Sequence, residues 1–133
     1  MTKREVFVQA LTRRSGFSQI VYDIVSTGER GNMNDKLGIL VSSDRHIDHL
    51  IGITKAAYRE GKTVKIFLTN KAVLLTKNER FTELEGICHI SLCSLCFESF
   101  KVDRPIPIVK DQDFGTQMRN VEIMKDCDRC IVL

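Results

Sequence analysis

The sequence predicts one α/β domain in which a mainly parallel sheet lies between two layers of helices, a Rossmann-like (flavodoxin-like) three-layer arrangement, preceded by a helical extension. Short runs of branched apolar residues at 37–41 and 64–68 are typical of strands buried on both faces. A segment with one apolar face separates them, which makes a strand–helix–strand unit with a right-handed crossover. The 133-residue chain is 43% hydrophobic, enough for one domain with its own core.

The first 35 residues form the predicted extension and linker, and residues 36–133 form the α/β domain. Polar, turn-forming residues at 31–35 mark the boundary. Helical spacing before this boundary predicts two short helices. These helices either cover an exposed face of the main domain or contact another subunit. The apolar residues that carry the spacing are Phe7, Ala10, Leu11, Phe17, Ile20, Val21, Ile24 and Val25.

Each boundary of the first strand–helix–strand unit has its own sequence signal. Residues 42–44 supply N-cap side chains for the helix, and Gly61 suits its C-terminal cap. The second strand follows at 64–68. Asn70 then caps a further helical segment, which Gly86 ends.

The second half of the domain repeats the alternation of strands and helices. A third strand spans 87–93 and includes Cys88 as a core residue. A short helix or turn follows, and two prolines then force an extended stretch. Thr116 caps a last helix, and a short final strand covers 130–133. The apolar residues along one side of the last helix are Met118, Val121 and Met124.

Composition and charge argue against several classes of protein. The formal net charge of +3 is weak and the chain has no Trp, so the sequence offers no stacking platform for nucleic acid. No apolar run approaches the roughly 20 residues that cross a membrane. No glycine-rich nucleotide fingerprint is present. Five cysteines, an odd number in a chain with an adequate core, predict reduced thiols and a cytoplasmic location.

Cys93 is the candidate reactive residue, because it stands where the third strand ends and a helix begins. Ligands and reactive groups gather at the C-terminal strand ends of an open parallel sheet, and a helix N-terminus favours a thiolate. Cys96, three residues later, completes a Cys-x-x-Cys motif of the redox-active kind. The alternative is a buried, inert thiol, since free cysteine is commonly buried.

Five polar side chains are expected to support this thiol. Ser94 follows it directly and, with the neighbouring backbone N–H groups, would stabilise a thiolate. Ser43 and Asn70 follow the first and second strands. His46 and His49 lie in the helix that leaves the first strand, where either imidazole would serve as a cationic partner or proton donor. The alternative for both histidines is a solvated position on the helix.

A second Cys-x-x-Cys pair, Cys127 and Cys130, invites a four-cysteine zinc site. The predicted fold opposes that site, because the two pairs fall at opposite ends of parallel strands about 20 Å long. An antiparallel last strand would remove this objection, so a metal-binding module stays an alternative. The preferred interpretation gives Cys127 and Cys130 a structural role and includes no metal.

Residues 36–133 resemble the DsrE/DsrF/TusD-like family of small sulfur-relay proteins. The resemblance lies in the order and spacing of four segments. These are the strand at 36–41 (KLGILV) with the helix ending at 56–61 (AAYREG), the segment 63–75 (TVKIFLTNKAVLL), the strand at 86–93 (GICHISLC) and the closing strand at 127–133 (CDRCIVL).

The resemblance implies that Cys93 accepts a sulfane sulfur as a persulfide and hands it to a cysteine of a partner protein. This is the same exchange chemistry as thiol–disulfide exchange and needs no metal or organic cofactor. Sulfur donor and acceptor proteins and a homo-oligomer are the implied partners, with no nucleic acid and no membrane. Cys96 departs from the family pattern, because it would resolve a persulfide into a disulfide and release sulfide. A non-catalytic oligomeric scaffold of the same fold remains the other alternative.

Overall fold

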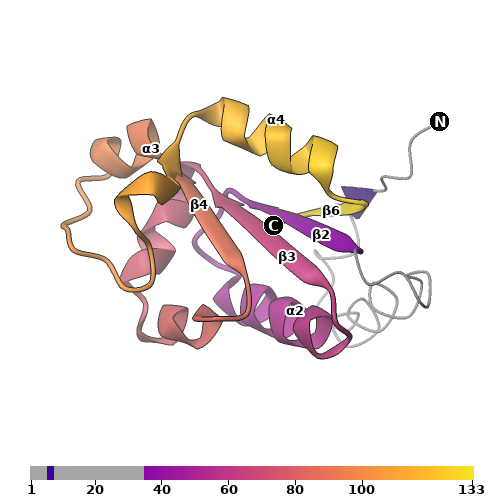
Figure 1. Ribbon diagram of the computed structural model, residues 1–133. Helices are drawn as coiled ribbons and strands as arrows, with labels where there is room; N and C mark the ends of the chain where they lie inside the picture. The colour runs from indigo at the N-terminus through magenta and orange to yellow at the C-terminus, as the bar shows by residue number, and fades with distance from the viewer. Residues whose placement is uncertain (1–5, 8–34) are drawn as a thin grey trace.

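A parallel sheet forms the centre of the computed structural model, which describes residues 6–7 and 35–133 (Figure 1). Over these residues the strands form one sheet in the order β1-β6-β2-β3-β4-β5, and the strand pairs are parallel. The predicted α/β fold is therefore confirmed. The strands are β1 (Val6–Phe7), β2 (Lys36–Val41), β3 (Thr63–Leu68), β4 (His89–Cys93), β5 (Phe114–Gly115) and β6 (Arg129–Val132).

Helices cover both faces of this sheet. Figure 1 shows α4 (Gln117–Asp126) on one side and α2 (Ile47–Arg59) on the other. The 3-10 helices η3 (Asn70–Lys77) and η4 (Glu79–Leu84) pack on the α2 side. The short helices α3 (Ser94–Ser99) and η5 (Asp111–Asp113) follow β4. Over the described part of the chain, no helix is long and apolar enough to cross a membrane.

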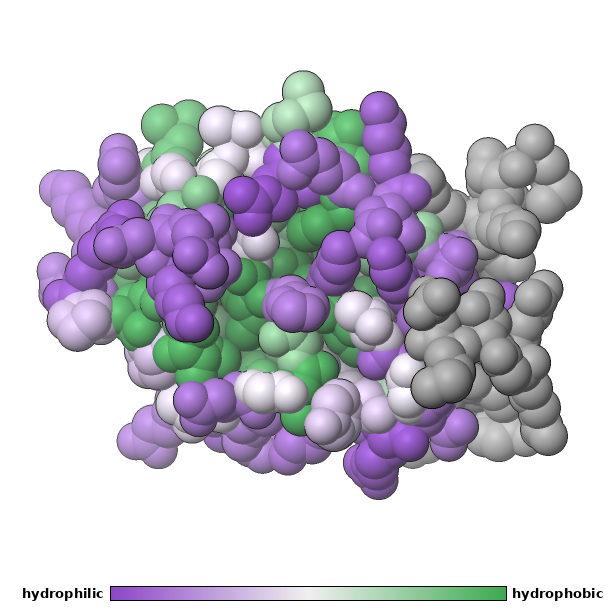
Figure 2. Space-filling model, viewed as in Figure 1, coloured by the Kyte–Doolittle hydropathy of each residue, from purple (hydrophilic) through white to green (hydrophobic). Residues whose placement is uncertain are grey.

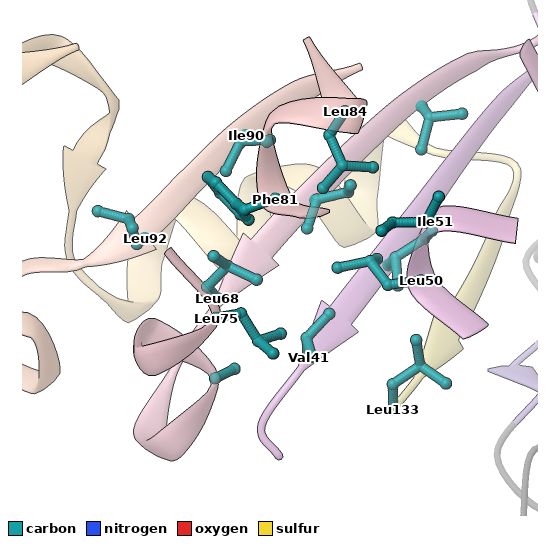
Figure 3. Close-up of a cluster of buried hydrophobic side chains, with 14 of the residues drawn as sticks. Val41, Leu50, Ile51, Leu68, Leu75, Phe81, Leu84, Ile90, Leu92 and Leu133 are labelled. Carbon is teal, nitrogen blue, oxygen red and sulfur yellow. The ribbon is translucent and has the colours of Figure 1, made fainter. Parts of the chain in front are cut away.

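The larger core lies between the sheet and the α2 side (Figure 3). Alternate residues of each strand face it, because successive side chains of a strand point to opposite faces of the sheet. Phe81 and Leu84 of η4 complete this layer. The residues labelled in Figure 3 are Val41, Leu50, Ile51, Leu68, Leu75, Phe81, Leu84, Ile90, Leu92 and Leu133, and all are buried.

A smaller cluster lies between the sheet and α4. Its buried members are Phe67, Cys93, Ile123, Cys127 and Cys130. Gly38 of β2 lets the helix approach, because a Cβ at this position would lie 3.2 Å from Cγ2 of Ile123 and 3.3 Å from Sγ of Cys127. One helix therefore covers the face of the sheet to which the side chain of Cys93 belongs.

Two predicted helix starts differ from the structure. No side chain caps α2, whose N-cap residue is His46, while Ser43 Oγ accepts a hydrogen bond from the backbone N–H of Arg45 in the preceding turn. The segment after β3 is two 3-10 helices, and Thr69 rather than Asn70 occupies the N-cap position of η3. Asn70 instead has a φ of 52°, in the left-handed region that Asn tolerates.

The predicted helix ends are confirmed, because Gly61 follows the C-cap residue of α2 and Gly86 lies in the turn that follows η4. Gly61 and Gly86 each have a φ of 77°, which suits a residue without a Cβ. Cys88 lies just before β4 rather than inside it. Its side chain is only partly buried, and its thiol donates to the carbonyl of Leu84.

The predicted apolar side of the last helix is wrong in orientation. Met118 and Val121 of α4 are 62% and 41% exposed, whereas Ile123 is buried against the sheet. The absent side chain of Gly38 explains this, because it leaves room for Ile123 at the closest approach of helix and sheet. Thr116 does cap the helix, since its hydroxyl accepts from the backbone N–H of Met118 at 3.2 Å.

The structure describes little of the predicted N-terminal extension. Val6–Phe7 form β1, a short strand beside Cys130 and Ile131 of β6, so Phe7 is not helical. The other residues of the two predicted helices and the linker up to residue 34 lie outside the described residues.

Candidate thiol site

Two thiols of the predicted Cys-x-x-Cys motif meet at the C-terminal edge of the sheet. Cys93 ends β4 and occupies the N-cap position of α3, where it is 4% exposed. The first turn of α3 carries Cys96, whose side chain is partly exposed. The nearby thiol of Cys93 is one of the groups that lower the pKa of the Cys96 thiol. The structure therefore brings together the two residues that the sequence selected.

Cys96 also contacts the residues that follow β3, the neighbouring strand. Its Sγ lies 3.6 Å from Oγ1 of Thr69 and accepts from the backbone N–H of Asn70. Partial burial by itself raises the pKa of the Cys96 thiol. The hydrogen bonds of Thr69, Asn70 and Cys93 outweigh burial, so this pKa lies below its ordinary value.

Asn70 acts in this site through its backbone rather than through its side-chain amide. Its left-handed φ belongs to the sharp turn in which β3 passes into η3. The backbone N–H of this turn donates to the Cys96 sulfur. Asn70 is thus at the site that the sequence predicted, but by a contact that no sequence pattern shows.

Thr69 and Gln117 also belong to this site, although neither is among the predicted supporting side chains. Nε2 of Gln117, the first residue of α4, donates to Oγ1 of Thr69 at 2.8 Å. The position of Thr69 at the end of a strand, directly before Asn70, places it at the same edge of the sheet from the sequence alone. No local signal exists for Gln117, which lies 21 residues after Cys96 in the chain and reaches the site only through the fold.

Ser94 has a structural contact instead of the predicted one with the thiolate. Its hydroxyl donates to the carbonyl of Gly115 at 3.2 Å, which ties the start of α3 to β5. Because Leu92 and Cys93 pair with Phe114 and Gly115, this bond fixes the edge of the sheet on which the two thiols lie.

The two histidines form a pair at the start of α2. Their rings pack edge to face with centroids 5.5 Å apart. Burial lowers the pKa of His49, and the neighbouring His46 lowers it further, although Asp48 acts in the opposite direction. The groups that lower the pKa of Cys96 include neither histidine nor Ser43. The structure therefore shows no support from these three residues for the thiol.

Two of the other cysteines, Cys88 and Cys127, differ from Cys96 in acidity. All five cysteines are free thiols. Burial raises the pKa of Cys88 to about 12. Burial also raises the pKa of Cys127 to about 12, with a smaller contribution from Cys130. Protonated thiols of this kind are poor nucleophiles, so neither Cys88 nor Cys127 has the lowered pKa that favours reaction at Cys96.

The strand direction decides against a four-cysteine metal site. β6 is parallel to β2, and Cys130 stands level with His89 of β4 in the register of the sheet. Cys93 lies four residues beyond His89 and three strands from Cys130, which separates them by about 13 Å along the strands and about 14 Å across them. Within the described residues no group of three or more His, Cys, Asp or Glu side chains could hold a metal ion.

The surface beside β4 is hollowed. Figure 2 shows apolar side chains in the middle of the face seen in Figure 1, with hydrophilic side chains around them. A polar cleft of about 820 Å³ is lined on this part of the molecule by Lys36, Lys65, Ser91, Arg119 and Asp126, among others. Both lysines bind the carboxylate of Asp126, so one negative charge is shared between two ammonium groups.

Comparison with known protein families, curated proteins and solved structures finds no match for this chain.

Proposed function

We propose that this protein is a Rossmann-like sulfur carrier of the DsrE-like kind, which accepts a sulfane sulfur as a persulfide at the Cys93–Cys96 pair and passes it to the thiol of a partner protein. The observation that carries the proposal is the partly exposed sulfur of Cys96, which three hydrogen bonds favour as a thiolate. A thiolate, not a thiol, is the nucleophile in sulfur exchange.

The contacts favour Cys96 as the thiol that attacks, whereas the family resemblance assigns the sulfur to Cys93. Cys93 is 4% exposed, so a donor reaches Cys96 more easily. In the loading step, the Cys96 thiolate attacks the outer sulfur of a donor persulfide. A bond forms between Cys96 Sγ and that sulfur, the S–S bond of the donor breaks, and the donor leaves as a thiolate.

Unloading is the reverse exchange with an acceptor. A thiolate of the acceptor attacks the outer sulfur of the Cys96 persulfide, and Cys96 leaves as a thiolate. The groups that stabilise the resting thiolate, above all Thr69 and Asn70, also stabilise this leaving group. A leaving thiol of low pKa departs faster. One set of hydrogen bonds therefore serves both directions of transfer.

The contact between the two thiols supports a second function, persulfide reduction. In this reaction the Cys93 thiolate attacks Sγ of the Cys96 persulfide. A Cys93–Cys96 disulfide forms, the bond to the outer sulfur breaks, and sulfide leaves. Each turnover then needs a dithiol reductant to restore the two thiols. Release of sulfide together with an intramolecular disulfide distinguishes this reaction from transfer.

The proposed partners are sulfur donor and acceptor proteins and further copies of this chain in a homo-oligomer. The cytoplasm is the proposed location, because its reducing conditions keep the two thiols available for transfer. Light scattering during size exclusion measures the assembly. An oligomer that loads no sulfur in any form would favour the non-catalytic scaffold instead.

Sulfur loading of single-cysteine variants tests the proposal. The protein is incubated with inorganic polysulfide, desalted and treated with cyanide, which removes a sulfane sulfur as thiocyanate. We expect Cys96→Ser to lose the labile sulfur and Cys127→Ser, a matched change of a buried cysteine, to keep it. Cys93→Ser should retain loading but release no sulfide. Full loading of the Cys96→Ser variant would contradict the assignment to Cys96.

A further inference from the structure

We propose that Gln117 and Thr69 are positioning residues, which aim the hydroxyl proton of Thr69 at the sulfur of Cys96 and thereby make the reactivity of this thiol depend on α4. The inference deepens the proposed function and rests on it only in taking Cys96 as the thiol that reacts. Neither residue touches the transferred sulfur in this account, since both act through Cys96.

The direction of the hydrogen bonds follows from the donors and acceptors. A Thr hydroxyl has one proton and can also accept, whereas the nitrogen of a Gln amide only donates. Nε2 of Gln117 lies 2.8 Å from Oγ1 of Thr69, so the hydroxyl accepts there. Its proton is then left for its other side-chain contact, the Cys96 sulfur at 3.6 Å. A thiolate can only accept, so this arrangement suits the charged form of Cys96.

Three elements hold this chain of contacts in place. Thr69 directly follows β3, where its backbone N–H donates to the carbonyl of Val41 at 2.9 Å. Gln117 is the first residue of α4, whose start is fixed by the cap of Thr116. Cys96 belongs to α3. The acidity of one thiol therefore depends on the packing of α3, β3 and α4 against one another.

The Gln117→Glu variant tests the inference, because it keeps the shape of the side chain and reverses the hydrogen bond. A carboxylate accepts the Thr69 proton and turns it away from Cys96. The measurement is the rate of Cys96 alkylation by iodoacetamide against pH, followed by peptide mass. We expect the midpoint of the rate profile to rise by about one pH unit, a roughly tenfold fall in the thiolate-to-thiol ratio. Gln112→Glu places the same charge on an exposed glutamine at the cleft and should leave the midpoint unchanged.

Changes at Thr69 separate positioning from simple charge repulsion. Thr69→Val removes the hydroxyl and should raise the midpoint of the Cys96 alkylation profile. Thr69→Ser keeps a hydroxyl and should leave that midpoint near its native value. If Gln117 acts through Thr69, Gln117→Glu shifts the midpoint less in the Thr69→Val background than in the native protein. An unchanged midpoint in Gln117→Glu, or an equal shift in both backgrounds, would overturn the inference.

The alkylation profile is measured without a sulfur donor, so the positioning role and the proposed function can be refuted independently of each other. A protein that shows the shifted midpoint but takes up no sulfur would overturn the proposed function and leave the positioning of Cys96 standing. A protein that loads sulfur on Cys96 but has the same alkylation midpoint in the native form and in Gln117→Glu would overturn the positioning role and leave the proposed function standing.

Discussion

Replacement of Phe67 by alanine should strongly destabilise the fold. Phe67 is fully buried in the cluster between the sheet and α4, which it shares with Cys93 and Cys130. Loss of a buried Phe side chain costs about 3–5 kcal/mol, the sum of the lost apolar burial and the cavity left behind. That is a large part of the roughly 5–15 kcal/mol by which a domain is stable.

Urea unfolding measures this loss as a lower midpoint at an unchanged slope. Met118→Ala is the matched control, because Met118 lies on the helix that covers Phe67 yet is 62% exposed. We expect it to change the free energy of unfolding by less than about 0.5 kcal/mol. The Phe67→Ala variant should also alkylate Cys93 faster, since the cavity opens beside this thiol. A cost below about 1 kcal/mol for Phe67→Ala, or an equal cost for Met118→Ala, would refute this account of the α4 face.

Three further predictions concern α4 and its contacts. Gly38→Val should lower the urea midpoint, because even a Cβ at this position would lie 3.2 Å from Cγ2 of Ile123. An unchanged midpoint would mean that α4 can shift away from the sheet without loss of stability. Thr116→Ala should cost about 1 kcal/mol in the same assay through loss of the N-cap of α4, and a neutral result would discount that cap. Hydrogen bonds from two lysines lower the pKa of Asp126 to about 2. Its stabilising effect is therefore present above the unfolded pKa near 3.8 and is lost as the pH falls through about 2. Asp126→Asn should accordingly lower thermal stability slightly at pH 7 and by much less at pH 2, whereas an equal difference at both values would contradict the ion pairs.

The central strands were predictable from the sequence because burial on both faces selects branched apolar residues. The predicted runs at 37–41 and 64–68 each lie within one residue of the observed strand. The face of α4 was not predictable in this way. Its orientation depends on the contact of Ile123 with Gly38, a residue 85 positions earlier that leaves no periodic signal.

The sequence predicts those residues of the site that lie at or directly after the end of a strand. Cys93 and Cys96 follow from the end of a strand and a Cys-x-x-Cys spacing, and Asn70 from the end of the neighbouring strand. The difference in exposure between the two thiols depends on three-dimensional packing, as does the contact of Gln117 with Thr69. His46 was placed near the thiol because strand ends share one edge, but it follows the end of β2, which lies two strands away from β4.

Peptide mapping of the protein after incubation with inorganic polysulfide shows which thiol carries the sulfur. Alkylation traps the persulfide, and digestion with and without reductant locates it. We expect a reductant-labile gain of one sulfur atom on Cys96 and none on Cys88 or Cys127, whose thiols are protonated. A gain confined to Cys88, Cys127 or Cys130, or no gain on a Cys96 that alkylates readily, would contradict this expectation.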